Sequence, residues 1–233
     1  MLAEDLFGLN IRGVKSVYTL WVRPRRYFEA AQTPDWGGKF TPSIRLWLSF
    51  FAIFAALKFW WLGSSDGMTG AYAAGFAQAG LQLPAGMTYE EVGAEAVLLV
   101  FGMVPFLQMF AMLLLALFYP FWGRPMTLTL RQRYLFGVIL PSTSLMPILM
   151  TIMIFVPQNM MTLYGVGLAL VTFLIDLQAG YRGGFAHRNG AQRFWRAGLL
   201  AFVVVVLNTL TSVGAQIAGI IYINQKYAFV PPG

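Results

Sequence analysis

The sequence predicts an all-α membrane protein, a bundle of five transmembrane helices preceded by an amphipathic helix. Of its 233 residues, 58% are hydrophobic and only 11% are charged, so polar side chains are too few to cover a soluble domain of this length. The apolar residues gather in five runs, each close to the ~20 residues that a helix needs to cross a bilayer. The predicted crossings are residues 44–62, 96–119, 134–156, 161–178 and 197–223.

The positive charges predict how this bundle is oriented. Lys and Arg are retained on the cytoplasmic side of a membrane. All 16 Lys and Arg residues except Lys58 and Lys226 fall in segments that this rule predicts to lie inside. The N-terminus is therefore predicted inside and the C-terminus outside. The predicted parts of the chain are a basic lead at 1–42, a transmembrane domain at 43–223 and an outer tail at 224–233.

Composition also excludes several kinds of chemistry. The chain carries a net charge of +7, but its cations stand in blocks beside apolar runs, a pattern typical of membrane topology rather than of nucleic-acid binding. It has no cysteine, which excludes disulfides, thiol nucleophiles and cysteine-bound metal clusters. The single histidine, His187, lies in a predicted inner loop, so no crossing offers an imidazole to a haem. We expect no cofactor and no metal site.

The basic lead contains the predicted amphipathic helix. Residues 11–22 place Val14, Tyr18 and other apolar residues at helical spacing, and Pro24 ends the helix. The following RPRRYF offers three cations and two aromatic rings to a phosphate-rich surface, so we predict contacts with anionic lipid headgroups. The alternative is that these cations only set the topology. The cations concerned are Arg23, Arg25 and Arg26.

After the basic lead come the first crossing, which contains Lys58, and a connector without cations. Lys58 stands near the far end of the crossing beside two tryptophans, so we expect its ammonium group to reach the outer interface; the alternative is a functional charge inside the membrane. The connector at residues 63–87 has no Lys or Arg and is predicted outside, with a short helix over residues 71–81.

The second and third crossings carry capping and proline signals. Thr88 and Glu91 form a T-x-x-E capping box that starts the second helix, and Pro105 predicts a kink in it. The third crossing contains Pro141 and Pro147 around three hydroxyl residues. Either a kink or a break is expected there, and broken helices line the binding sites of some transporters.

Asp176 lies near the inner end of the fourth crossing. We expect an interfacial acid paired with Arg131, Arg133 or Arg182; the alternative is an acid of a proton relay. The GYRGG sequence at residues 180–184 predicts a tight turn after the helix, with a glycine-rich anion-binding loop as the alternative.

The fifth crossing has the clearest predicted helix-packing face. Small residues recur at four-residue spacing, which lets two helix backbones approach closely in a membrane. Their partner is predicted to be a helix of this chain or of another protein. The residues of this small-residue face are Gly214, Ala215, Ala218 and Gly219.

Two sequence stretches resemble known membrane families. LWVRPRRYF and GGKFTPSIRLWLSFF resemble the N-terminal region of uncharacterised bacterial inner-membrane families, in which a basic RP segment and a P-x-x-R-L-x-L entry precede four or five helices. The topology is also similar to that of the Yip family of membrane-trafficking proteins, although the acidic glycine-proline motif of eukaryotic Yip members is missing. The resemblance covers residues 18–51 by motif and the rest by hydropathy. It implies a non-enzymatic membrane component and transfers no site residue.

The sequence thus predicts a non-catalytic integral protein of a bacterial inner membrane, a scaffold or accessory subunit that packs against a larger membrane complex. Expected partners are anionic lipid headgroups and other integral membrane subunits, and not nucleic acid. The alternative function is a small transporter or channel for an ion or lipid that uses the proline-containing third helix with Lys58 and Asp176. An enzyme is least favoured, because no acid–base pair stands at one depth.

Overall fold

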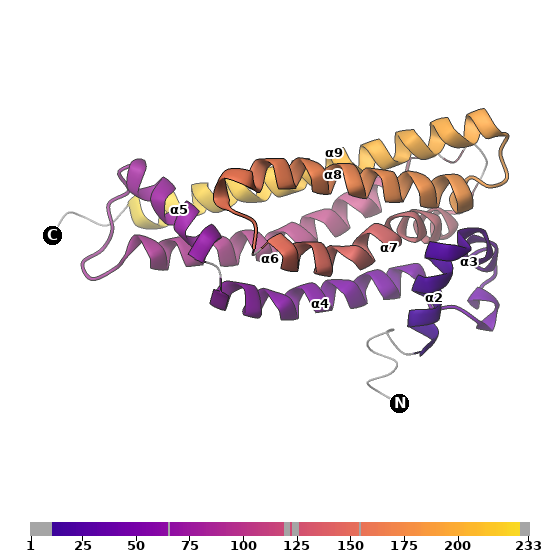
Figure 1. The fold of residues 1–233 in the computed structure, drawn as a ribbon, viewed down its shortest axis with the longest axis horizontal. Helices are drawn as coiled ribbons and strands as arrows, with labels where there is room; N and C mark the ends of the chain where they lie inside the picture. Colours follow the sequence, from indigo (N-terminus) through magenta and orange to yellow (C-terminus); the bar gives the residue numbers. More distant parts are fainter. Residues whose placement is uncertain (1–10, 65, 119–121, 123–125, 154, 229–233) are drawn as a thin grey trace.

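The computed structural model describes residues 11–64, 66–118, 122, 126–153 and 155–228, which contain helices and no strand. Five long helices run roughly along the longest axis of the molecule (Figure 1). They are α4 (Ser43–Ser64), α6 (Tyr89–Leu115), α7 (Leu128–Met153), α8 (Met161–Ala179) and α9 (Gly190–Ala228). The prediction of an all-α bundle is confirmed for these residues.

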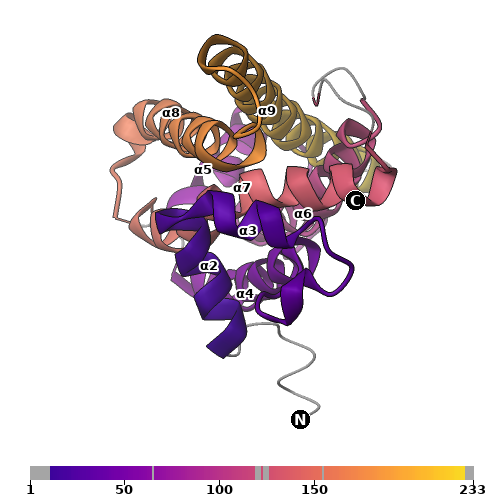
Figure 2. The same cartoon turned by 90° about the vertical axis from the view of Figure 1, so that its right-hand side faces the viewer.

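Shorter elements lie at the two ends of the bundle. At one end, called the α2–α3 end below, are α2 (Ile11–Val22), α3 (Pro24–Ala30) and the 3₁₀ turn η1 (Trp36–Gly38). At the opposite end is α5 (Asp66–Gln78). Figure 2 looks at the α2–α3 end and shows both helices lying across the ends of the long ones.

Helices that follow one another in the chain mostly pack side by side, because the connections between them are short. The 3₁₀ turn η3 (Gln158–Met160) lies between α7 and α8, which pack on each other, and α8 packs on α9. α4 packs on α7, while α6 packs on α5 and α9. The largest group of buried side chains fills the α2–α3 end and includes Tyr27, Trp122, Tyr134 and Phe185.

Four of the described helices are long and apolar enough to cross a membrane. In α4, the apolar stretch with described side chains is the shorter Ser43–Ile53. Large apolar side chains such as Phe106, Leu163 and Phe202 are exposed on the outside of the long helices, as expected where lipid rather than water surrounds a bundle. The chain is therefore a multi-pass membrane protein. The four candidate spans are Tyr89–Leu115, Leu128–Met153, Thr162–Gly184 and Gly190–Tyr227.

The capping box and the short connector helix are both present. The Glu91 N–H donates to Thr88 Oγ1 (3.2 Å), and the Thr88 N–H donates to Glu91 Oε2 (2.8 Å), so α6 begins where its sequence signal predicts. The connector forms α5, which starts earlier than the predicted residue 71. α5 packs closely on α6 at Gly93, where an added Cβ would lie 2.6 Å from the Thr69 carbonyl oxygen.

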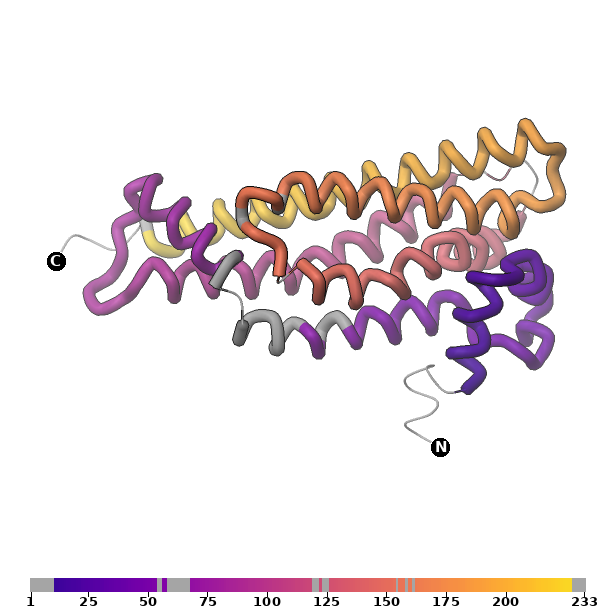
Figure 3. The backbone as a smooth tube through the Cα atoms, in the orientation of Figure 1, coloured from indigo at the N-terminus to yellow at the C-terminus, as the bar shows by residue number. Residues whose placement is uncertain are grey.

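α7 is bent and not broken. The helix continues from Leu128 to Met153 through Pro141 and Pro147, while its ribbon changes direction between its two halves (Figures 1 and 3). Proline removes a backbone donor and is the usual cause of such a bend. Near it, the Ser142 hydroxyl donates to the Ile139 carbonyl (2.8 Å), an alternative bond for the backbone in the bent region.

The predicted tight turn at residues 180–184 is wrong. Gly180–Gly184 forms a π-helical turn, η4, that prolongs α8 without a break. The Phe185 N–H closes this turn by donating to the Gly180 carbonyl (2.9 Å). α9 then begins at Gly190, ahead of the predicted start of the fifth crossing at residue 197, because the polar GAQRFWR segment extends the helix beyond its apolar part.

Candidate functional site at the α2–α3 end

Phe28 anchors α3 to the bundle through a socket formed by glycines. Its ring is 2% exposed. A Cβ added at Gly183 would lie 2.5 Å from Phe28 Cε2, and one added at Gly137 would lie 3.0 Å from Phe28 Cε1. At Gly183 only glycine leaves room for the ring, and at Gly137 a Cβ would require the ring to move by a few tenths of an ångström. The π-helical turn η4 therefore forms part of the contact surface for α3, which explains the glycine at position 183.

Tyr27 of α3 is also buried, next to Phe28. Its hydroxyl donates to the Thr41 carbonyl (2.8 Å), and the Thr41 N–H donates to the hydroxyl of Ser16 in α2 (2.8 Å). Burial raises the pKa of Tyr27, so its hydroxyl remains a proton donor. The prediction that the two aromatic rings of RPRRYF face a phosphate surface is wrong, because both lie in the core.

Two arginines of the bundle hold the ends of the short helices. Arg133 of α7 donates to the carbonyls of Ala31 (3.0 Å) and Thr33 (2.7 Å), and Arg182 of η4 donates to the carbonyl of Val22 (3.1 Å). The last carbonyls of a helix lack partners within it, and cations near them are favourable. These contacts fix both α2 and α3 on the bundle.

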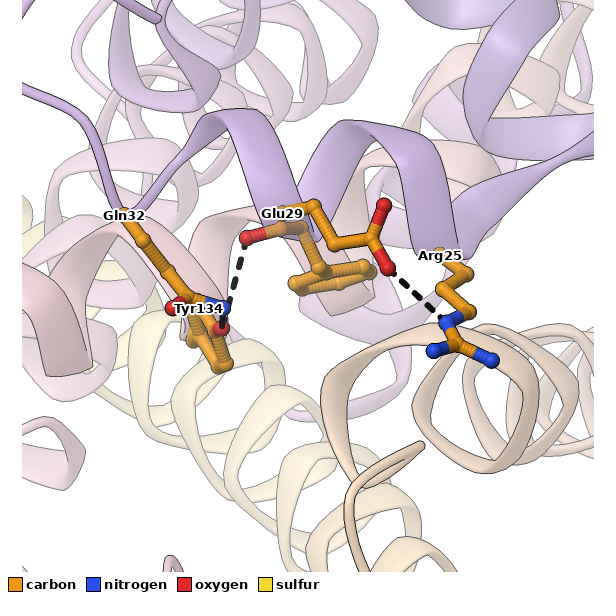
Figure 4. A network of polar contacts seen from close by, with 5 residues as sticks. Arg25, Glu29, Gln32 and Tyr134 are labelled. Carbon is orange, nitrogen blue, oxygen red and sulfur yellow. Dashed lines mark hydrogen bonds and ion pairs between the residues drawn. The ribbon is translucent and has the colours of Figure 1, made fainter.

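A second polar contact joins α3 to α7 (Figure 4). The Tyr134 hydroxyl donates to the Phe28 carbonyl (3.3 Å) and accepts from Gln32 Nε2 (2.9 Å). Arg25 points away from this contact and forms an ion pair with Glu29 (2.9 Å). Arg25 thus belongs to the outer surface of α3.

One side of α2 is packed and the other carries exposed apolar side chains. Gly13, Ser16 and Leu20 face the bundle and are buried. The opposite side exposes Val14 (60%) and Tyr18 (65%). Apolar side chains repeated on the exposed side of a helix need a covering surface. We call this set the apolar stripe of α2; it consists of Ile11, Val14, Tyr18 and Val22.

A groove of about 790 Å³ lies beside this stripe, between α2, α3 and the segment around η1. We call it the basic groove. Its charged lining consists of four cations and the Glu29 carboxylate, and its apolar lining includes side chains from the stripe. The cations are Lys15, Arg23, Arg26 and Lys39; Tyr18, Thr19, Val22, Ala30, Gly37 and Phe40 complete the lining with Glu29.

The structure thus brings together two of the three predicted headgroup-binding arginines, Arg23 and Arg26, and places Arg25 outside the groove. Sequence reasoning missed Lys15 and Lys39 as members of the same site. The spacing of Lys15 and Thr19 on one helical face was a usable signal for Lys15. Lys39 could not be assigned from the sequence, because its place depends on the turn at η1.

Asp176 forms a separate buried feature in α8. Its side chain is 0% exposed, and neither carboxylate oxygen has a hydrogen-bond partner among the described residues. Ser142 of α7 lies within interaction range, but its hydroxyl donates to the Ile139 carbonyl. The predicted pairing of Asp176 with an arginine is therefore wrong. Sequence position near the helix end suggested an interface, but η4 and α3 cover that end.

The predicted small-residue face of α9 divides into two sides. Ala215 and Gly219 are buried, and a Cβ added at Gly219 would lie 2.8 Å from Val100 Cγ2 of α6. Gly214 and Ala218 are exposed, and nothing lies within 4 Å of a Cβ added at Gly214. One half of the face therefore packs within the chain and the other half is exposed.

Lys58 falls in α4, but its side chain lies outside the described residues.

Among the described residues, no three His, Cys, Asp or Glu side chains gather as a metal site. No family model, curated protein or solved structure matches the chain. The resemblance of residues 18–51 to bacterial inner-membrane families and to the Yip family stays a prediction.

Proposed function

We propose that this is a non-catalytic protein of a bacterial inner membrane, an accessory subunit or scaffold that packs against a larger membrane complex. The observation that carries the proposal is the rigid attachment of α2 and α3 at one end of the bundle, where they present apolar and cationic side chains together. Such a fixed surface supports docking to a membrane and to partners rather than turnover of a substrate.

The arrangement of α2 supports its placement at the inner interface. α2 lies across the direction of the long helices (Figures 1 and 2), so it lies along the membrane surface when they cross the bilayer. Its apolar stripe then faces the acyl boundary while Arg23, Arg25 and Arg26 lie at headgroup level. We propose five crossings with the N-terminus inside and the C-terminus outside, with α4 as the first, since its 22 residues extend about 33 Å.

The free side of α9 supports a helical partner. Gly214 and Ala218 are exposed beside the large apolar side chains Leu210, Ile217 and Ile221. Small residues flanked by larger apolar ones allow close packing of a second transmembrane helix. We propose that another integral membrane subunit contacts this side.

Purification from native membranes in mild detergent, followed by mass spectrometry, tests the proposal. We expect stoichiometric membrane partners that are lost in the Gly214→Leu variant. Gly165→Leu in α8 is the matched control, since a Cβ added at either glycine meets nothing within 4 Å. A protein that purifies as a partner-free monomer would contradict the proposal, as would equal loss in both variants.

The buried carboxyl group of Asp176 favours the transporter or channel as a second candidate, together with Lys58 and the bend of α7 near Pro141 and Pro147. A buried carboxylate without partners is costly, so such a group in a membrane bundle indicates proton or cation binding. Asp176→Asn should abolish flux in liposomes and leave the helix content unchanged. Absence of measurable flux of any ion or lipid through the wild-type protein would eliminate this candidate.

A further inference from the structure

We propose that the basic groove binds the phosphate group of an anionic glycerophospholipid whose acyl chains lie along the apolar stripe of α2. This inference rests on the membrane placement of α2 proposed above. It identifies one defined lipid site at that surface, where the sequence indicated only a general attraction between cations and headgroups.

The charges of the groove favour an anionic ligand. Lys15, Arg23, Arg26 and Lys39 form no ion pair in the part of the chain that the structure describes. The one acid in the lining, Glu29, is already paired with Arg25 at 2.9 Å. The groove therefore has an excess of positive charge, because its only carboxylate is already paired with a cation outside the groove. A phosphate can accept charge-assisted hydrogen bonds from several of the four cations.

The nearby acid Asp35 forms no ion pair with these cations in the described part of the chain. Its Oδ1 accepts from the Gly37 N–H (3.1 Å) and caps η1. This turn brings Lys39 to the groove opposite the cations of α2 and α3. Because Phe28, Arg133 and Arg182 hold both helices on the bundle, the walls of the groove are preorganised, which lowers the entropic cost of binding.

The apolar lining favours a lipid over free phosphate. Tyr18 and Val22 line the groove and also belong to the exposed stripe of α2. A bound headgroup would therefore have its acyl chains beside a continuous apolar path. A soluble phosphate would use only the cations and leave this path uncovered.

Native mass spectrometry of the full-length protein in detergent, titrated with phosphatidylglycerol, tests the site. A cation near a lipid surface is worth about fivefold in affinity, so Arg23→Gln with Arg26→Gln should weaken binding about 25-fold. Lys15→Gln with Lys39→Gln should weaken it by a similar factor. The matched control is Arg12→Gln with Arg45→Gln, which removes the same charge at exposed positions outside the groove and should change binding less than about threefold.

Equal losses in the groove and control variants would overturn the proposal, because they would show attraction by the whole basic surface. Tight binding of phosphatidylcholine would overturn the requirement for an anion. Displacement of the lipid by inorganic phosphate, but not by chloride at equal ionic strength, would show that the groove binds a soluble anion. This result would contradict a lipid as the ligand. Arg23 and Arg26 are exposed, so unchanged circular dichroism is expected. Co-purification of membrane partners is measured in a separate experiment. Loss of the proposed lipid site would therefore not contradict the proposed function.

Discussion

Phe28 is the residue on which the attachment of α3 depends. Truncating a buried aromatic ring removes its packing and leaves a cavity, which costs about 3–5 kcal/mol. We expect Phe28→Ala to destabilise the protein in detergent by this amount, measured by chemical unfolding. Gly183→Val should also destabilise it, by about 1–3 kcal/mol, since its side chain would occupy the space of the Phe28 ring.

A second glycine controls for the general effect of adding a side chain. Nothing lies within 4 Å of a Cβ added at Gly165 of α8, so Gly165→Ala should leave the stability within about 1 kcal/mol of wild type. Combining Gly183→Ala with Phe28→Leu should recover part of the stability that Gly183→Ala alone loses, because the two side chains share one space. Independent, additive effects of the two changes would show that the socket does not determine the fit.

At the level of elements, α3 is too short to be stable alone and depends on Arg133. An isolated helix of this length is marginal in water, and Arg133 donates to carbonyls at its end. Arg133→Gln should lose about 1.5–3 kcal/mol of local stability and raise the hydrogen-exchange rates of α3 amides about tenfold or more. Arg25→Gln, which breaks only an exposed pair, should leave these rates nearly unchanged. Unaltered exchange in Arg133→Gln would contradict this role.

The sequence was sufficient for the long helices, because hydropathy and capping are local. The capping box of Thr88 and Glu91 and the proline that ends α2 both appear as predicted. The burial of Phe28 was not predictable in this way. Its socket combines Gly137 and Gly183, which are distant from Phe28 in the chain. In addition, the GYRGG sequence of η4 is typical of a tight turn rather than of a π-helical one.

At the level of the whole molecule, the opposite end of the bundle is closed by contacts that hydropathy could not reveal. Lys226 Nζ donates to Glu95 Oε1 (2.6 Å), and the Tyr227 hydroxyl donates to Glu95 Oε2 (2.8 Å). Glu95 and Lys226 are 131 positions apart, and they meet because α9 packs on α6. The contact places the start of α6 and the end of α9 at the same end of the bundle.

The number of crossings can be measured with single cysteines, since the chain has none of its own. Arg25→Cys and Gln82→Cys flank α4, so a membrane-impermeant maleimide should label only Gln82→Cys in right-side-out vesicles if α4 crosses. Gln192→Cys and Gln225→Cys lie near the two ends of α9 and should behave in the same way, with only Gln225→Cys labelled. All four positions are exposed, and detergent should make all four reactive, which controls for access. If Arg25→Cys and Gln82→Cys react from the same side, α4 does not cross, and the positive residues before it do not set the orientation of the later helices.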